Sequence, residues 1–140
     1  MTALSDRVVE FLSAGTRTGM LAFVAADGRP LVTPVWFVVD DGELVFTTHR
    51  DTPKYRALQR DPRIAICVDD PHPPYSFVQV QGTATVADDP PHVLDIATRT
   101  GARYMGADRA DEFGRRNAVP GEMVVRVHPT KILSGFDISD

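Results

Sequence analysis

The longest alternating segment of the chain covers residues 75–87. Apolar and polar side chains alternate along it, as expected for a β-strand with one face in a core and the other outside. A strand of this length in a chain of 140 residues is expected to curl into a barrel. Gly82 inside it predicts a bend or the close approach of another backbone. The apolar members are Phe77, Val78, Val80 and Val86, and the polar members are Gln79, Gln81, Thr83 and Thr85.

Three further strands are predicted to follow one another directly near the start of the chain. Residues 19–25 and 30–39 flank Asp27-Gly28, a dipeptide typical of a tight hairpin turn. A second turn, Asp40-Asp41-Gly42, leads into a strand over residues 43–48. The pattern predicts an antiparallel β-meander.

The second of these strands is almost continuously apolar. Leu31, Val32 and every residue from 35 to 39 are hydrophobic, which indicates burial on both faces and a second surface that covers the strand. Pro34 cannot donate a hydrogen bond to a neighbouring strand. The backbone there is expected at an edge, at a bulge or beside something other than a strand.

Helices are predicted at both ends of the chain. Ser5 is a favourable N-cap for a first helix that ends at Gly15. Two later helices are predicted over residues 90–101 and 107–118.

The remaining strands complete a barrel. They are predicted over residues 64–69 and 122–128, with a final edge over residues 131–136. We therefore expect one domain over residues 1–140, of α+β class and mainly β. It should contain about six antiparallel strands in a barrel, with peripheral helices.

A candidate anion site follows the strand over residues 43–48. Thr52 is a favourable N-cap and Pro53 a favourable first residue for a short helix. Lys54, with Arg50 and Arg56 on either side, then places cations where the helix dipole is already positive. A phosphate group bound between them would resolve this conflict. The alternative is that these side chains extend into water. The candidate ligands are Thr47, Thr48, Arg50, Thr52 and Lys54.

The composition argues against several classes of protein. The single cysteine, Cys67, excludes a disulfide framework and a cysteine-based metal cluster, and no metal site is predicted. A formal net charge of −4 argues against a nucleic-acid-binding face, which is normally basic. No segment is apolar enough to span a membrane or to direct export, so a cytoplasmic protein is expected.

Several short motifs occur in a recognisable order. They are Gly19-Met20-Leu21-Ala22, Asp27-Gly28-Arg29-Pro30, Val35-Trp36-Phe37, Phe46-Thr47-Thr48, Lys54-Tyr55-Arg56, Asp61-Pro62-Arg63 and Gly82-Thr83-Ala84. Over residues 7–136 this order resembles the pyridoxamine 5′-phosphate oxidase-like split β-barrel family, and most of all its branch that uses the deazaflavin coenzyme F420. The resemblance implies a six-stranded split barrel, a homodimer, and a flavin or deazaflavin in a groove between the protomers.

The resemblance also implies which residues hold the tricyclic ring of the cofactor. The strand along which the ring lies corresponds to Thr33, Pro34, Val35 and Trp36. This position would account for a proline within the strand. Gln79 and Gln81 correspond to a strand that the second protomer contributes.

The anionic tail of the cofactor is implied to lie at the candidate phosphate site. Thr47 and Thr48 correspond to hydroxyls near the ribityl chain and phosphate, and Thr52 and Lys54 to the phosphate-binding turn. Flavin oxidases of the family tend to have an Arg-Lys pair in this turn, where the present chain has Pro53-Lys54. The chain also lacks the family's C-terminal Trp and Arg signature for pyridoxal phosphate, so oxidation of vitamin B6 is not implied.

The implied activity is F420-dependent reduction of a small unsaturated or quinone-like acceptor. Such an enzyme positions the reduced cofactor against an electron-poor double bond and excludes water, and it needs no catalytic triad. No catalytic residue is therefore assigned. Two alternatives remain open: an FMN-binding oxidoreductase of the same family, and a non-catalytic protein that stores or delivers a flavin, F420 or a tetrapyrrole.

Overall fold

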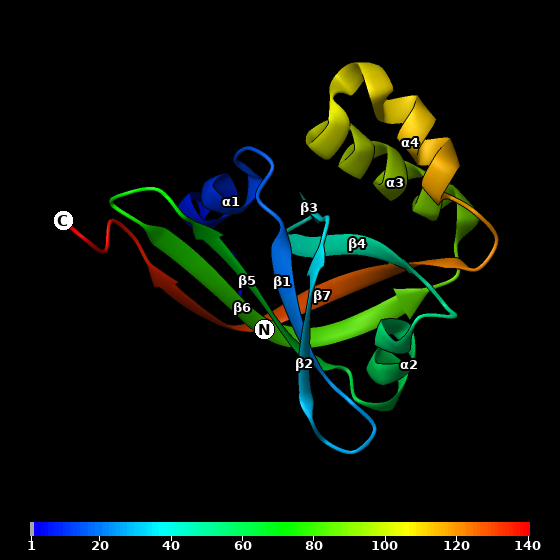
Figure 1. The fold of residues 1–140 in the computed structure, drawn as a ribbon, viewed down its shortest axis with the longest axis horizontal. Coiled ribbons are helices and arrows are strands. Elements are labelled where there is room, and N and C mark those ends of the chain that lie inside the picture. The colour runs from blue at the N-terminus through cyan, green and yellow to red at the C-terminus, as the bar shows by residue number, and fades with distance from the viewer. Residues whose placement is uncertain (1) are drawn as a thin grey trace.

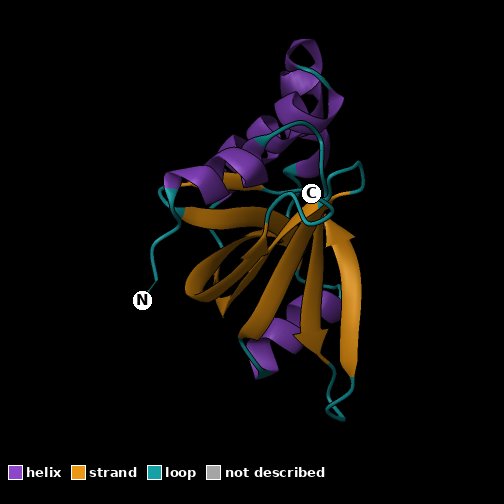
Figure 2. Cartoon of the chain, turned by 90° about the vertical axis from the view of Figure 1, so that its left-hand side faces the viewer, coloured by secondary structure: helices purple, strands orange, loops and turns teal. Residues whose placement is uncertain are grey.

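The long alternating strand lies at the centre of the sheet. β6 (Ser76–Ala87) pairs antiparallel with β5 (Arg63–Asp70) on one side and with β7 (Glu122–Gly135) on the other. In this computed structural model, which describes residues 2–140, seven strands form one sheet in the order β2-β1-β5-β6-β7-β4-β3 (Figure 1). The sheet curves around a core, with helices next to it (Figure 2). Two of the helices contribute Val8, Leu12, Ala57 and Leu58 to that core. The predicted α+β split barrel is confirmed.

The other elements follow the predicted turns and caps. The other strands are β1 (Gly19–Val24), β2 (Pro30–Val35), β3 (Val38–Asp40) and β4 (Glu43–His49). The helices are α1 (Asp6–Ser13), α2 (Pro53–Arg60), α3 (Pro90–Met105) and α4 (Ala110–Asn117), with a single 3-10 turn, η1 (Ala107–Arg109), between the last two. No helix of residues 2–140 is both long enough and apolar enough to cross a membrane.

The sheet has seven strands where about six were predicted, because the strand expected over residues 30–39 is interrupted. β2 ends at Val35 and β3 begins at Val38. Between them the Phe37 N–H donates to Tyr104 Oη over 3.3 Å, and the Phe37 carbonyl accepts from Arg103 Nη1 at 2.7 Å. Side chains of α3 therefore take the place of a neighbouring strand, and β2 and β3 pair with different partners, β1 and β4.

The two halves of this predicted strand also differ in burial. Phe37 is fully buried, but Val32 is 63% exposed in the chain by itself. The expected burial on both faces therefore holds only for the second half. Pro34 pairs with Met20 on β1, and β2 is an edge of the sheet. Of the three environments proposed for this proline, the structure shows the edge.

β7 combines two segments that were predicted as separate strands. The ladder between β6 and β7 shifts register between Gln81 and Gly82, opposite Pro129. A Cβ at Gly82 would overlap the His128 carbonyl oxygen, so only glycine fits there. The predicted close approach of another backbone is confirmed. Because of this irregularity, β7 continues past Pro129 as one strand. It pairs with β4 over residues 122–127 and with β6 over residues 124–135.

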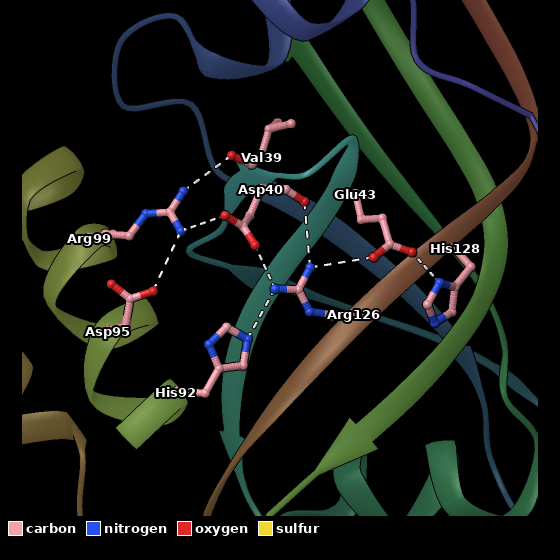
Figure 3. A network of polar contacts seen from close by, with 8 residues as sticks. All are labelled: Val39, Asp40, Glu43, His92, Asp95, Arg99, Arg126 and His128. Atoms are coloured by element: carbon pink, nitrogen blue, oxygen red, sulfur yellow. Dashed lines mark hydrogen bonds and ion pairs between the residues drawn. The ribbon is translucent and has the colours of Figure 1, made fainter. Parts of the chain in front are cut away.

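A network of ion pairs attaches α3 to the β3–β4 hairpin (Figure 3). Asp40 accepts from Arg99 Nη1 of α3 at 2.8 Å and from Arg126 Nη2 of β7 at 2.5 Å. Arg126 also contacts Glu43 and His92, and Glu43 pairs with His128. Below this network, Val38, Val45, Val93, Ile96 and Val124 form a small core between α3 and the sheet. The network and the small core together fix the position of α3.

We predict that Asp40→Asn destabilises the protein by about 1–3 kcal/mol at pH 7, because it removes the charged acceptor of two arginines. Hydrogen bonds from Arg126 and then Arg99 lower the pKa of Asp40. The stabilisation is therefore complete above the carboxyl's unfolded pKa of about 4 and is lost as the pH falls through its lower folded value. Urea unfolding of both proteins should show a difference in stability that narrows towards pH 3.

The matched control is Asp95→Asn. Asp95 is more exposed and lies 3.7 Å from Arg99 one helical turn away, so its loss should cost less than about 0.5 kcal/mol. Equal losses for the two variants would show that Asp40 does not have the anchoring role described above.

Candidate functional site

A cavity of 410 Å³ opens where the end of β2, the start of α2 and the α3–α4 hairpin meet. Its volume lies within the range of pockets that bind small molecules. We call it the Trp36–Lys54 cavity. Its lining residues are Pro34, Val35, Trp36, Thr47, Lys54, Thr100, Arg116, Asn117, Val119 and Glu122. Five of the eleven predicted site residues are therefore brought together in one place.

Trp36 forms an aromatic wall of this cavity, and Tyr104 holds one face of its ring in place. Its ring stacks on that of Tyr104, with 5.0 Å between centroids and 8° between planes. Tyr104 is fixed in turn, because its Oη donates to the Arg17 carbonyl oxygen at 2.8 Å. Trp36 remains 36% exposed. The indole is thus a rigid, accessible surface against which a flat ring could stack.

The start of α2 is built as the sequence predicts. Thr52 Oγ1 accepts from the Tyr55 N–H at 3.2 Å and donates to the His49 carbonyl at 2.8 Å. It also lies 3.2 Å from Oγ1 of Thr48, a residue that is only 4% exposed. The predicted cap is confirmed. Since both hydroxyls are engaged within the turn, they position α2 rather than face the cavity.

Lys54, in the first turn of α2, reaches the cavity with its side chain half-buried. Burial lowers the pKa of Lys54, and the nearby Glu122 carboxylate opposes that shift. No described residue forms an ion pair with its ammonium group. The cation therefore remains available to a ligand.

Glu122, the first residue of β7, supplies the negative charge of the cavity. Burial raises its pKa, while His49, the Thr47 hydroxyl and Lys54 act in the opposite direction. Sequence reasoning missed Glu122. The signal is absent from the local sequence, because only the pairing of β4 with β7, which sets Glu122 opposite His49, brings it near Lys54.

Four further residues of the α3–α4 region line the cavity. The sequence predicts helices over residues 90–101 and 107–118 but does not identify any of their residues as part of the site. The packing of this hairpin on the sheet turns these positions towards the cavity, and nothing in their spacing identifies them. They are Thr100, Arg116, Asn117 and Val119.

Other predicted site residues lie around the cavity without lining it. Thr33 pairs with Leu21 of β1, on the opposite side of β2 from Pro34. Arg50 lines an adjacent cavity of 410 Å³, together with Asp88, and Glu122 borders both cavities. Arg50 is therefore placed next to the candidate site, beyond Glu122.

Gln79 and Gln81 lie elsewhere, on the outer face of β6. Gln81 Nε2 donates to Gln79 Oε1 at 2.8 Å, and neither residue lines the Trp36–Lys54 cavity. The same face of the sheet exposes hydrophobic side chains of three other strands. We call this surface the outer sheet face. Its exposed hydrophobic members are Met20 (39%), Val32 (63%) and Leu133 (49%).

The residues of the cavity match the chemistry of a flat ring that carries an anionic group. The indole of Trp36 offers a stacking surface, and the ammonium of Lys54 and the hydroxyl of Thr47 can bind an anion at the positive end of α2. Arg116 adds a second cation. Within residues 2–140 there is no cluster of three or more His, Cys, Asp or Glu side chains placed to hold a metal ion.

The chain is similar to several known proteins. The family model described as pyridoxamine 5′-phosphate oxidase matches residues 4–134. A search of curated proteins gave no match. A solved structure named F420 reductase is 30% identical, with a TM-score of 0.68, over 89% of this chain and 94% of that protein.

Two further structures show how widely the fold is shared. A conserved hypothetical protein from Mycobacterium tuberculosis is 25% identical, with a TM-score of 0.84, over 97% of this chain and 87% of that one. A heme storage protein from Vibrio cholerae is 19% identical, with a TM-score of 0.72, over 99% and 100% of the two chains. The latter similarity shows the fold alone.

We predict that Thr52→Ala lowers the free energy of unfolding by about 1 kcal/mol, because α2 loses its N-cap. Thr52→Ser keeps the hydroxyl and should retain most of the stability. Urea denaturation of the three proteins measures this difference. Equal stability of the Ala variant and the parent would contradict the structural role given to Thr52.

Proposed function

The chain belongs to the pyridoxamine 5′-phosphate oxidase family, and from this premise we propose that it is an F420-dependent oxidoreductase that reduces a small unsaturated or quinone-like acceptor. The observation that carries the proposal is the Trp36–Lys54 cavity, where a fixed indole and an available cation face one space. The 30% identity to a protein named F420 reductase, over most of both chains, supports F420 over FMN.

The proposal gives each part of the cavity a task. The deazaflavin, when bound, supplies the hydride. Trp36 and the β2 residues Pro34 and Val35 orient the ring, and Lys54 with Thr47 offsets the charge of the phosphate. The α3–α4 hairpin covers the cavity on the side of Asn117 and limits the access of water.

We also propose that two chains form a homodimer through the outer sheet face. Exposed hydrophobic side chains that share one face often mark an interface, and here Met20 of β1, Val32 of β2 and Leu133 of β7 are exposed on the same face of the sheet. Dimerisation would bury them and would place Gln79 and Gln81 in the interface. In the family these positions approach the cofactor of the partner protomer, so the proposal assigns them that role.

We predict that Lys54→Ala weakens the binding of F420 by about 1.5–3 kcal/mol, the usual cost of losing a charge-assisted hydrogen bond. Isothermal titration of the parent and the variant with F420, and separately with FMN, measures the loss. The matched control is Arg60→Ala, which removes an exposed cation from the other end of the same helix. This control should bind as the parent does.

The titrations with F420 and with FMN together distinguish the possible outcomes. If the Lys54 variant binds F420 and FMN as tightly as the parent does, the phosphate assignment is wrong. If the parent binds FMN alone, the site stands and the chain is an FMN-dependent member of the family. Tight binding of F420 with no reduction of any quinone or enone acceptor would indicate storage or delivery of the cofactor instead of catalysis.

For the dimer, we predict that Val32→Glu shifts the protein from dimer to monomer, because it places a charge in the centre of an apolar contact. Analytical ultracentrifugation in dilute solution measures the shift. Leu94→Glu is the control, since Leu94 is an exposed residue of α3 away from the outer sheet face. A parent protein that is monomeric and still binds cofactor would overturn the shared-groove arrangement.

A further inference from the structure

Glu122 is the only carboxylate among the residues that line the Trp36–Lys54 cavity. Its position is fixed by the backbone, since its N–H donates to the Val119 carbonyl at 3.0 Å and it pairs with His49 across the ladder between β4 and β7. Glu122 therefore lines the same cavity as Lys54. An anion bound by Lys54 must lie close to a second anion.

His49 lowers the pKa of Glu122 from outside the cavity, and Lys54 lowers it from within the cavity. The His49 ring contacts the Asp51 N–H through Nδ1 at 3.1 Å and the Pro120 carbonyl oxygen through Nε2 at 3.0 Å. The charged or titratable groups that face Glu122 are His49 from β4, Lys54 from α2, Arg116 from α4, and Arg50 and Asp88 across the adjacent cavity.

We infer that Glu122 competes with the anionic group of the cofactor for Lys54, so that binding of the cofactor is coupled to the uptake of one proton by Glu122. The inference rests on the proposed function. In the free protein, the Glu122 carboxylate and the Lys54 ammonium attract each other within the cavity without forming an ion pair. On binding, the carboxylate takes a proton from solvent and becomes a neutral carboxylic acid, and Lys54 pairs with the phosphate.

The physical reason is that a second anion bound next to Glu122 in a half-buried site makes the charged form of Glu122 less favourable. Burial alone already raises the pKa of Glu122, which makes protonation easier. Because the bound form binds one more proton than the free form, affinity must fall as the pH rises through the range in which Glu122 ionises. Glu122 thereby acts as a positioning residue that makes retention of the cofactor dependent on pH.

The test is calorimetric titration of the parent and Glu122→Gln with F420 between pH 5 and pH 8.5, in buffers of different ionisation enthalpy. The dependence of the heat on the buffer gives the number of protons taken up. Protons that the cofactor itself binds are common to both proteins, so the difference belongs to Glu122. The parent should take up to about one proton more than the variant, and its affinity should fall by up to about tenfold per pH unit.

Glu122→Gln should bind more tightly than the parent at pH 8, by about tenfold for each pH unit by which binding would shift the Glu122 pKa. Asp88→Asn is the matched control, because it removes one negative charge from the adjacent cavity and should leave the proton count of the parent unchanged. An infrared difference spectrum of the parent needs no variant. On addition of F420 it should show a new protonated carboxyl band.

The outcomes are distinct. If the parent binds F420 or FMN with the same proton uptake and pH profile as Glu122→Gln, or shows no protonated carboxyl band, the inference is overturned and the proposed function stands. If the parent binds neither cofactor, the proposed function fails and the inference fails with it.

Discussion

The guanidinium group of Arg103 joins chain segments that no strand ladder connects. It donates to the carbonyl oxygens of Phe37 at 2.7 Å, Leu12 at 2.6 Å and Gly15 at 3.0 Å. Arginine suits this position because its five donors form a rigid, planar fork and because it stays charged even where burial lowers its pKa. The end of α1 and the interruption between β2 and β3 are thereby tied to α3. The Phe37 carbonyl group, which lies in the gap between β2 and β3 next to Trp36, is thereby paired although no strand ladder reaches it.

Much of the fold could be predicted because it depends on local chemistry. The N-cap at Thr52 with Pro53 after it, the turn at Asp27-Gly28 and the glycine at position 82 each act over a few residues. Alternation along the strands also predicted which residues share a face. These rules were enough to predict an antiparallel α+β barrel and an anion site at Lys54, whereas the split form of the barrel and the role of Trp36 came from the family resemblance.

What could not be predicted depends on contacts between distant segments. The strand through Trp36 is interrupted because Arg103 and Tyr104 bind the backbone of Phe37. These two residues belong to α3 and lie 66 and 67 positions after Phe37 in the chain. Glu122 meets Lys54 only through the register of β4 with β7. Neither of these contacts can be recognised from the residues that neighbour them in the sequence. The sequence therefore indicated Lys54 but not the carboxylate of Glu122 in the same cavity.

The stacked position of Trp36 gives the protein a built-in optical probe. Trp36 is the chain's single tryptophan, and it forms the wall of the Trp36–Lys54 cavity while Tyr104 holds its other face. Light absorbed by indole but not by tyrosine excites this one ring. Its emission therefore reports on a single place, without background from the core or from the outer sheet face. The occupancy of the cavity can thus be followed in solution without attaching a dye.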